Sequence, residues 1–69
     1  MKIKKPLIEI GQEIKVREWR DKGKMLNAKI TGDLVWVEDT DFWEIDIIYE
    51  NGDEHYAVWD GDEWMSGEL

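Results

Sequence analysis

The sequence predicts an all-β fold in which five short, strongly bent, antiparallel strands close into a small barrel. Three observations predict this fold. Apolar and polar residues alternate in short runs rich in β-branched and aromatic side chains, turn signals separate the runs, and no window has the spacing of an amphipathic helix. We expect the sheet to close because closure removes the exposed strand edges.

The strongest local signal is the pair Asn51-Gly52, which alternating runs flank on both sides. Both residue types tolerate the positive φ of a two-residue type I′ turn, so we expect a hairpin that joins about 42–50 to 53–59. On the first of these strands, Trp43 and Tyr49 share the phase of Ile45 and Ile47 and are predicted to face the core.

Two further elements complete the predicted barrel. A hairpin that turns at 21–24 (Asp-Lys-Gly-Lys) joins about 12–20 to 24–31. Residues 34–38 form another strand or the end of a long bent one. Gly32 is the expected bending point, because a glycine inside a strand pattern often marks a bulge or a barrel corner.

The 69 residues are expected to form one domain, 1–69, that depends on its apolar core. Residues 1–10 are predicted to be an N-terminal extension or a short edge strand, and 60–69 a tail that packs on the barrel. The chain has no cysteine and one histidine, which excludes a disulfide framework and argues against a structural zinc site. Five tryptophans supply much of the apolar area that such a short chain needs.

Several segments resemble one known architecture. A glycine followed by an alternating strand (Gly11 to Val16), a small residue before a basic one (Ala28-Lys29), and an aromatic-initiated strand that runs into a glycine turn (Trp43 to Gly52) are arranged as in Tudor-type domains. Over about residues 11–59 the chain therefore resembles a Tudor-like, SH3-like barrel. The resemblance implies a reader of methylated lysine or arginine whose aromatic cage includes Trp19 and a second ring at Tyr49.

Charge is distributed very unevenly along the chain. All nine lysines and arginines lie in residues 1–29 with four acids, whereas residues 30–69 carry the other thirteen acids and no base, so the two parts have charges of +5 and −13. This asymmetry predicts a directional field that steers a basic protein toward the acidic part and disfavours nucleic acid. Acidic strands could also imitate a run of phosphates, as in small phage-encoded inhibitors.

The candidate contact surface centres on the stretch Tyr-Ala-Val-Trp-Asp-Gly-Asp-Glu-Trp, at 56–64. Trp59 shares its phase with Ala57 and lies opposite Val58, which places it on the outer face unless the register differs. Trp19 also falls on an outer phase. In the alternative reading, the tail folds over one side of a curved barrel and covers these rings. The predicted binding residues are Trp19, Trp59, Asp60, Asp62, Glu63 and Trp64.

The residue inventory does not favour catalysis. The chain has one serine, two threonines and one histidine, so few nucleophiles can be activated, and His55 is read as a solvated strand residue. The segment 60–63 (Asp-Gly-Asp-Glu) is half of a calcium loop without helices and is read as a turn. We therefore expect no cofactor and no metal.

The predicted function is that of a non-catalytic module that binds a basic protein through its acidic, tryptophan-containing face. Two alternatives stay open: the Tudor-like reader built around Trp19, and an assembly protein that self-associates through exposed tryptophans. A monomer or weak homodimer is expected. The basic first residues are not followed by an apolar segment of signal length, so a cytoplasmic protein without a membrane partner is predicted.

Overall fold

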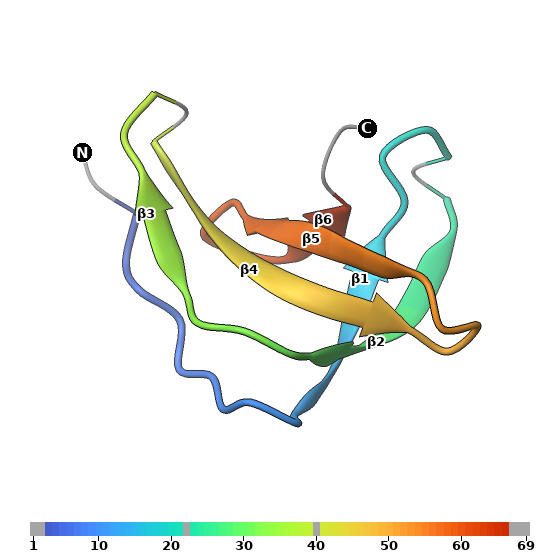
Figure 1. Cartoon of the computed structure of the whole chain (residues 1–69). Helices are drawn as coiled ribbons and strands as arrows, with labels where there is room; N and C mark the ends of the chain where they lie inside the picture. Colours follow the sequence, from blue (N-terminus) through green and yellow to red (C-terminus); the bar gives the residue numbers. More distant parts are fainter. Residues whose placement is uncertain (1–2, 22, 40, 67–69) are drawn as a thin grey trace.

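The computed structural model describes residues 3–21, 23–39 and 41–66, and these residues form an all-β, SH3-like barrel without a helix (Figure 1). The predicted fold class is thereby confirmed. The strands are β1 (Glu13–Arg17), β2 (Met25–Ile30), β3 (Val35–Val37), β4 (Phe42–Tyr49), β5 (Glu54–Trp59) and β6 (Trp64–Ser66).

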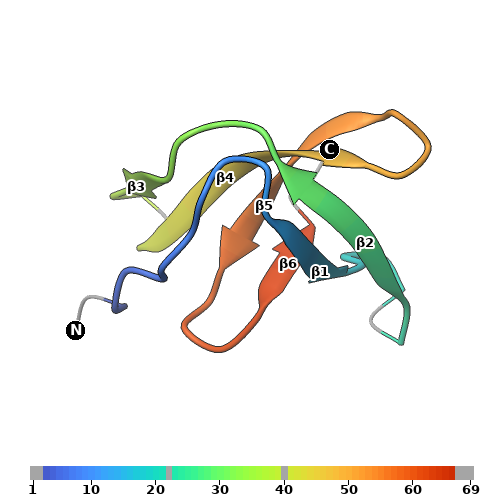
Figure 2. The same cartoon turned by 90° about the horizontal axis from the view of Figure 1, so that it is seen from below.

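Five of the six strands form a closed ring. The sheet order is β2-β1-β6-β5-β4-β3, and an additional pairing of β2 with the second half of β4 closes it, so that β3 extends the sheet beside the start of β4 (Figure 2). Every pairing is antiparallel except that of β1 with β6, which is parallel. This pairing was not expected. After the turn at 60–63, β6 runs antiparallel to β5 and therefore in the same direction as β1. It pairs with β5 along one edge and with β1 along the other.

The tail contributes more than a cover for the barrel, since β6 is one of the strands that close it. Residues 67–69 of the expected tail lie outside the described residues, as does Lys22 of the predicted turn. At the other end of the chain, residues 3–10 form no strand. Ile8 packs on the core, whereas Leu7 is 97% exposed.

The β4–β5 hairpin is where predicted, but its turn differs from the prediction. The loop has three residues, 50–52, because the Gly52 amide donates to the Tyr49 carbonyl and the Tyr49 amide donates to the Asp53 carbonyl, both at 2.9 Å. Gly52 has a φ of 92°, and Asn51 does not share the positive φ that a type I′ turn requires of both residues. The arrangement matches a type I turn followed by a glycine bulge.

This extra loop residue reverses the predicted faces of β5. A two-residue loop would pair Ile45 with Val58, whereas the structure pairs it with Ala57. A shift of one residue moves every side chain of a strand to the opposite face. Ala57 is therefore completely buried and Trp59 turns toward the core, while Tyr56 and Val58 lie on the outer face.

The core lies inside the ring and draws on five strands. Its buried members are Val16, Ala28, Ile30, Ile45, Ile47, Ala57 and Trp64. The predicted inward position of Trp43 is confirmed: it is buried, its ring packs edge-on against Trp36 with centroids 5.1 Å apart, and its Nε1 donates to the carbonyl of Ile3 at 3.0 Å. The hydrogen bond to Ile3 ties the N-terminal extension to the barrel.

Gly32 permits a close approach of the chain to β4. A Cβ atom at this position would lie 2.7 Å from Oδ2 of Asp46, a distance that forces a clash. The Thr31 amide next to it donates to the Asp46 carbonyl at 2.9 Å. A glycine therefore fits without displacing Asp46 where the chain leaves β2 and crosses to β3, which accords with the predicted bending point.

Candidate functional site

The two tryptophans of the predicted contact surface lie mainly in the barrel interior. Trp64 is only 7% exposed and belongs to the core, and Trp59 is half-buried. Their ring centroids are 5.1 Å apart and the planes are inclined at 53°. The open alternative, in which the tail covers these rings, therefore describes them better than an exposed patch does.

Two of the acids beside these rings have partners within the chain. Glu63 accepts a two-point contact from Arg17, whose Nε lies 2.8 Å from Oε1 and whose Nη2 lies 3.0 Å from Oε2. This hydrogen bond and the charge of Glu63 raise the pKa of Arg17. The Oδ1 atom of Asp60 accepts hydrogen bonds from the backbone amides of Asp62 and Glu63, both at 2.8 Å, and so stabilises the turn. The parallel β1–β6 pairing brings Arg17 to a stretch that has no nearby base in sequence.

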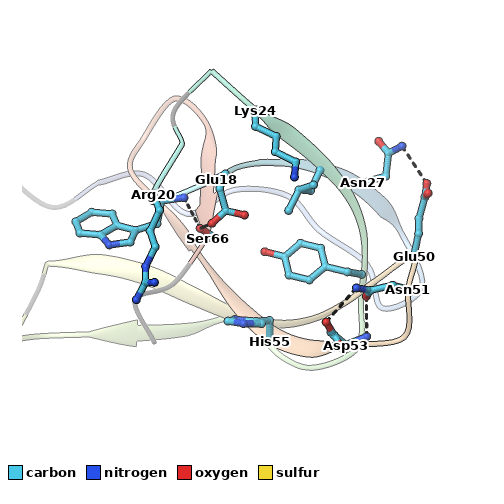
Figure 3. A pocket seen from close by; sticks show the side chains of 12 residues that line it. Glu18, Arg20, Lys24, Asn27, Glu50, Asn51, Asp53, His55 and Ser66 are labelled. Carbon is cyan, nitrogen blue, oxygen red and sulfur yellow. Dashed lines mark hydrogen bonds between the residues drawn. The ribbon is translucent and has the colours of Figure 1, made fainter.

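A second group of aromatic and acidic residues surrounds a pocket at one end of the barrel (Figure 3). The pocket has a volume of about 450 Å³ and lies between the β1–β2 loop and the β4–β5 loop. It is lined by Glu18, Trp19, Arg20, Lys24, Leu26, Asn27, Tyr49, Glu50, Asn51, Asp53, His55 and Ser66.

Tyr49 is one of the aromatic residues that line this pocket. Its hydroxyl is buried and has no hydrogen-bond partner among the described residues. Burial raises the pKa of Tyr49, and the negative charge of Glu18 adds to this effect. The ring lies 5.6 Å from that of His55, centroid to centroid. Because β5 is shifted in register, His55 is half-buried and lines the pocket, although the sequence reading placed it in solvent.

The wall that carries Trp19 is fixed by Ser66. The Ser66 Oγ accepts a hydrogen bond from the Trp19 amide at 2.6 Å and is 3.5 Å from Oε1 of Glu18, to which it donates. Ser66 is buried, whereas Trp19 is 45% exposed, which agrees with its predicted outer phase. The buried hydroxyl thus holds the start of the β1–β2 loop while the indole stays accessible.

The opposite wall is the β4–β5 loop, which has hydrogen bonds of its own. Asn51 accepts from the Asp53 amide through Oδ1 and donates to Asp53 Oδ2 through Nδ2, both at 3.0 Å. Asn27 of β2 donates to Glu50 Oε1 at 3.0 Å, which ties the loop to the neighbouring strand. Figure 3 shows both pairs at the rim of the pocket.

The charged side chains around the pocket have both signs. Glu18, Glu50 and Asp53 contribute three carboxylates, and Arg20 and Lys24 contribute two cations. Among residues 3–21, 23–39 and 41–66, no group of three or more possible ligands is placed to hold a metal ion. The pocket therefore offers ring faces, carboxylates and the unpartnered Tyr49 hydroxyl, which are groups suited to binding a polar or cationic side chain.

The structure thus separates the six predicted site residues. Trp19 lines the pocket, and the other five belong to the turn at 59–64 or to the core beneath it. Sequence reasoning missed His55 and Ser66. A three-residue loop in place of the predicted turn would have moved His55 to the inner face, whereas no sequence signal identified Ser66.

No protein-family model, curated protein or solved structure matches the chain. Within the described part of the chain, no helix is long and apolar enough to cross a membrane.

Proposed function

We propose that the chain is a non-catalytic binding module that engages a basic protein by taking one cationic side chain into the pocket beside Tyr49. The observation that carries this proposal is the pocket itself, in which Tyr49 and Trp19 come from separate elements and carboxylates lie at the same site. A cation near ring faces is attracted by their quadrupoles, and a carboxylate compensates its charge.

A methylated lysine or arginine is the form of this ligand that the resemblance to Tudor-like barrels favours. A quaternary ammonium keeps its charge but donates no hydrogen bond, so it depends on ring faces and nearby carboxylates for its binding energy. His55 supplies a further ring next to Tyr49. An unmodified ammonium could instead donate to the unpartnered Tyr49 hydroxyl, and the two ligands are distinguishable by experiment.

Arg20 and Lys24 oppose the binding of any cation, because both line the same pocket. If the proposal holds, removing either charge should strengthen binding. We expect Lys24→Met to raise the affinity for a cationic peptide about two- to three-fold, in line with the small energies of exposed charge pairs. A neutral ligand of the same shape should bind the wild type and Lys24→Met with equal affinity.

The test is a titration of the full chain with capped peptides that carry trimethyl-lysine, unmodified lysine or the neutral isostere norleucine. The indole resonance of Trp19 should shift with the cationic peptides and not with norleucine. Trp19→Ala and Glu18→Gln should weaken binding, whereas the matched charge change Glu9→Gln, at an exposed residue outside the pocket lining, should not. The proposal fails if all three peptides give the same response, or none at millimolar concentration.

A further inference from the structure

The outer face of the β3–β4–β5 sheet has a regular arrangement of acidic and apolar side chains. Register places Glu44 opposite Val58 and also opposite Val35 on the other neighbouring strand. Asp46 lies opposite Tyr56, and Ile48 lies opposite Glu54. Residues directly opposite one another on neighbouring strands have Cβ atoms about 4.5–5.5 Å apart. Each of these apolar residues therefore has a carboxylate beside it on a neighbouring strand.

The acidic outer face consists of Val35, Glu44, Asp46, Ile48, Glu54, Tyr56 and Val58. These residues alternate along their strands with the buried Trp43, Ile45, Ile47 and Ala57, which places them on the solvent side. Val35 is 55% exposed, and Asp46 and Glu54 are also exposed. In Figure 1 the three strands lie side by side.

Strands β3, β4 and β5 themselves contribute no lysine or arginine to this face. Strands β3 to β6 are neighbours in the sheet, and all of them come from residues 30–69, which contain no lysine or arginine. Because these strands are neighbours, the uneven distribution of charge along the chain becomes an uneven distribution of charge over the surface. At the boundaries, Lys29 of β2 stands opposite Ile48, and Arg17 of β1 is engaged with Glu63.

We propose that the acidic outer face docks a basic protein segment in which lysines or arginines alternate with apolar residues. Its carboxylates would meet the basic side chains, and Val35, Ile48 and Val58 would pack against the apolar ones. Charge complementarity selects the partner, because a chain with a net charge of −8 repels acidic proteins and further copies of itself. This surface is distinct from the pocket, so the inference does not depend on the proposed function.

The experiment uses two capped peptides of about six residues, one alternating lysine with valine and one alternating lysine with serine. Both are titrated into the isotopically labelled full chain. We expect saturable amide shifts at Glu44 and Val58 with the lysine–valine peptide, and affinity about five-fold lower for lysine–serine, because the second peptide has the same charge and no apolar surface.

Paired variants separate this face from general charge attraction. The double variant Glu44→Gln, Asp46→Asn should lower the affinity about five-fold, while Glu9→Gln, Asp21→Asn, which removes the same charge at exposed residues outside this face, should change it less than about two-fold. Trp19→Ala should leave binding to the outer face unchanged, which separates this inference from the pocket. Melting curves of each variant establish that it is folded.

Several results would overturn the inference. They are the absence of shifts on β4 and β5 at millimolar peptide, shifts confined to the pocket residues, and equal weakening by the two double variants. Concentration-dependent mass of the protein alone, with shifts at Glu44 and Val58 on dilution, would assign this face to a second copy and would also overturn it.

Discussion

The molecule contains two groups of aromatic and acidic residues with similar composition but different internal pairing. In the 59–64 turn, Trp59 packs on a buried Trp64, Arg17 neutralises Glu63, and Asp60 accepts backbone amides. At the pocket, by contrast, the Tyr49 hydroxyl has no partner among the described residues and Trp19 is nearly half exposed. Residues whose partners lie within the chain stabilise the fold, and those left accessible are available to a ligand.

This difference should be largest in the free energy of unfolding that is lost when a tryptophan of each group is replaced by alanine. Trp64→Ala should lower the free energy of unfolding by about 3–5 kcal/mol, because it removes a buried indole from the core. Trp19→Ala should cost less than about 1 kcal/mol, because its indole is largely solvated. Urea unfolding followed by circular dichroism measures both values.

The control for this experiment is Trp64→Phe, which keeps an aromatic ring in the core and remains measurable if the alanine variant does not fold. Its cost should lie between the other two. Equal losses for Trp19→Ala and Trp64→Ala would contradict the assignment of one ring to the pocket wall and the other to the core.

The next largest effect concerns Ser66, which connects the core to the pocket. Ser66→Ala should lower the free energy of unfolding by about 1–2 kcal/mol, because the Trp19 amide loses its 2.6 Å acceptor. Since the same hydroxyl positions the start of the β1–β2 loop, we also expect a shift of the indole resonance of Trp19. If Ser66→Ala changed neither the free energy of unfolding nor the indole resonance of Trp19, Ser66 would not be what holds the start of the β1–β2 loop.

The sequence was sufficient to predict the barrel, because alternation, turn residues and chain length all point to closed antiparallel strands. The error in β5 came from one local choice, since Asn51-Gly52 is compatible with both a two-residue and a three-residue loop. The side-chain period of a strand is two, so one additional loop residue exchanged Tyr56 and Val58 for Ala57 and Trp59 on the inner face. An exact reading of loop length was therefore needed, and periodicity does not supply it.

The site was predicted less well than the fold because its residues are distant in sequence. Glu63 seemed uncompensated within residues 30–69, yet its partner Arg17 is 46 residues away and is brought close by the parallel pairing of β1 with β6. Likewise, Trp19, Tyr49 and Ser66 meet only after the barrel has closed. Local patterns predict elements, whereas a pocket depends on long-range pairing that they do not encode.

A smaller effect is expected from the pair Arg17–Glu63. Both side chains are about one-third exposed (33% and 32%), so the coupling between them should be modest and sensitive to salt. A double-mutant cycle with Arg17→Met and Glu63→Gln measures it through urea unfolding. We expect a favourable coupling energy that decreases as sodium chloride is raised from about 0.05 to about 1 M. A coupling energy of zero at low salt would mean that the turn acids are as uncompensated as those of the acidic outer face.

The smallest effect lies in the pH dependence of stability near the pocket. Burial and the charge of Glu18 raise the pKa of Tyr49 in the folded protein, whereas in the unfolded chain tyrosine titrates near its ordinary value of about 10. The folded state therefore holds this proton more tightly. The resulting stability is fully present below about pH 10 and is lost as the pH rises through the folded pKa.

Urea midpoints measured from about pH 9 to pH 11 should fall more steeply for the wild type than for Tyr49→Phe, which lacks the titrating group. Glu18→Gln should reduce the difference, since it removes the second cause of the raised pKa. Saturation with a trimethyl-lysine peptide, whose charge does not titrate, should lower the pKa of Tyr49 if the cation binds beside its ring, because a positive charge favours the phenolate. An unchanged slope in Tyr49→Phe would show that the hydroxyl is solvated, and the pocket would then lose the buried group that distinguishes it from the 59–64 turn.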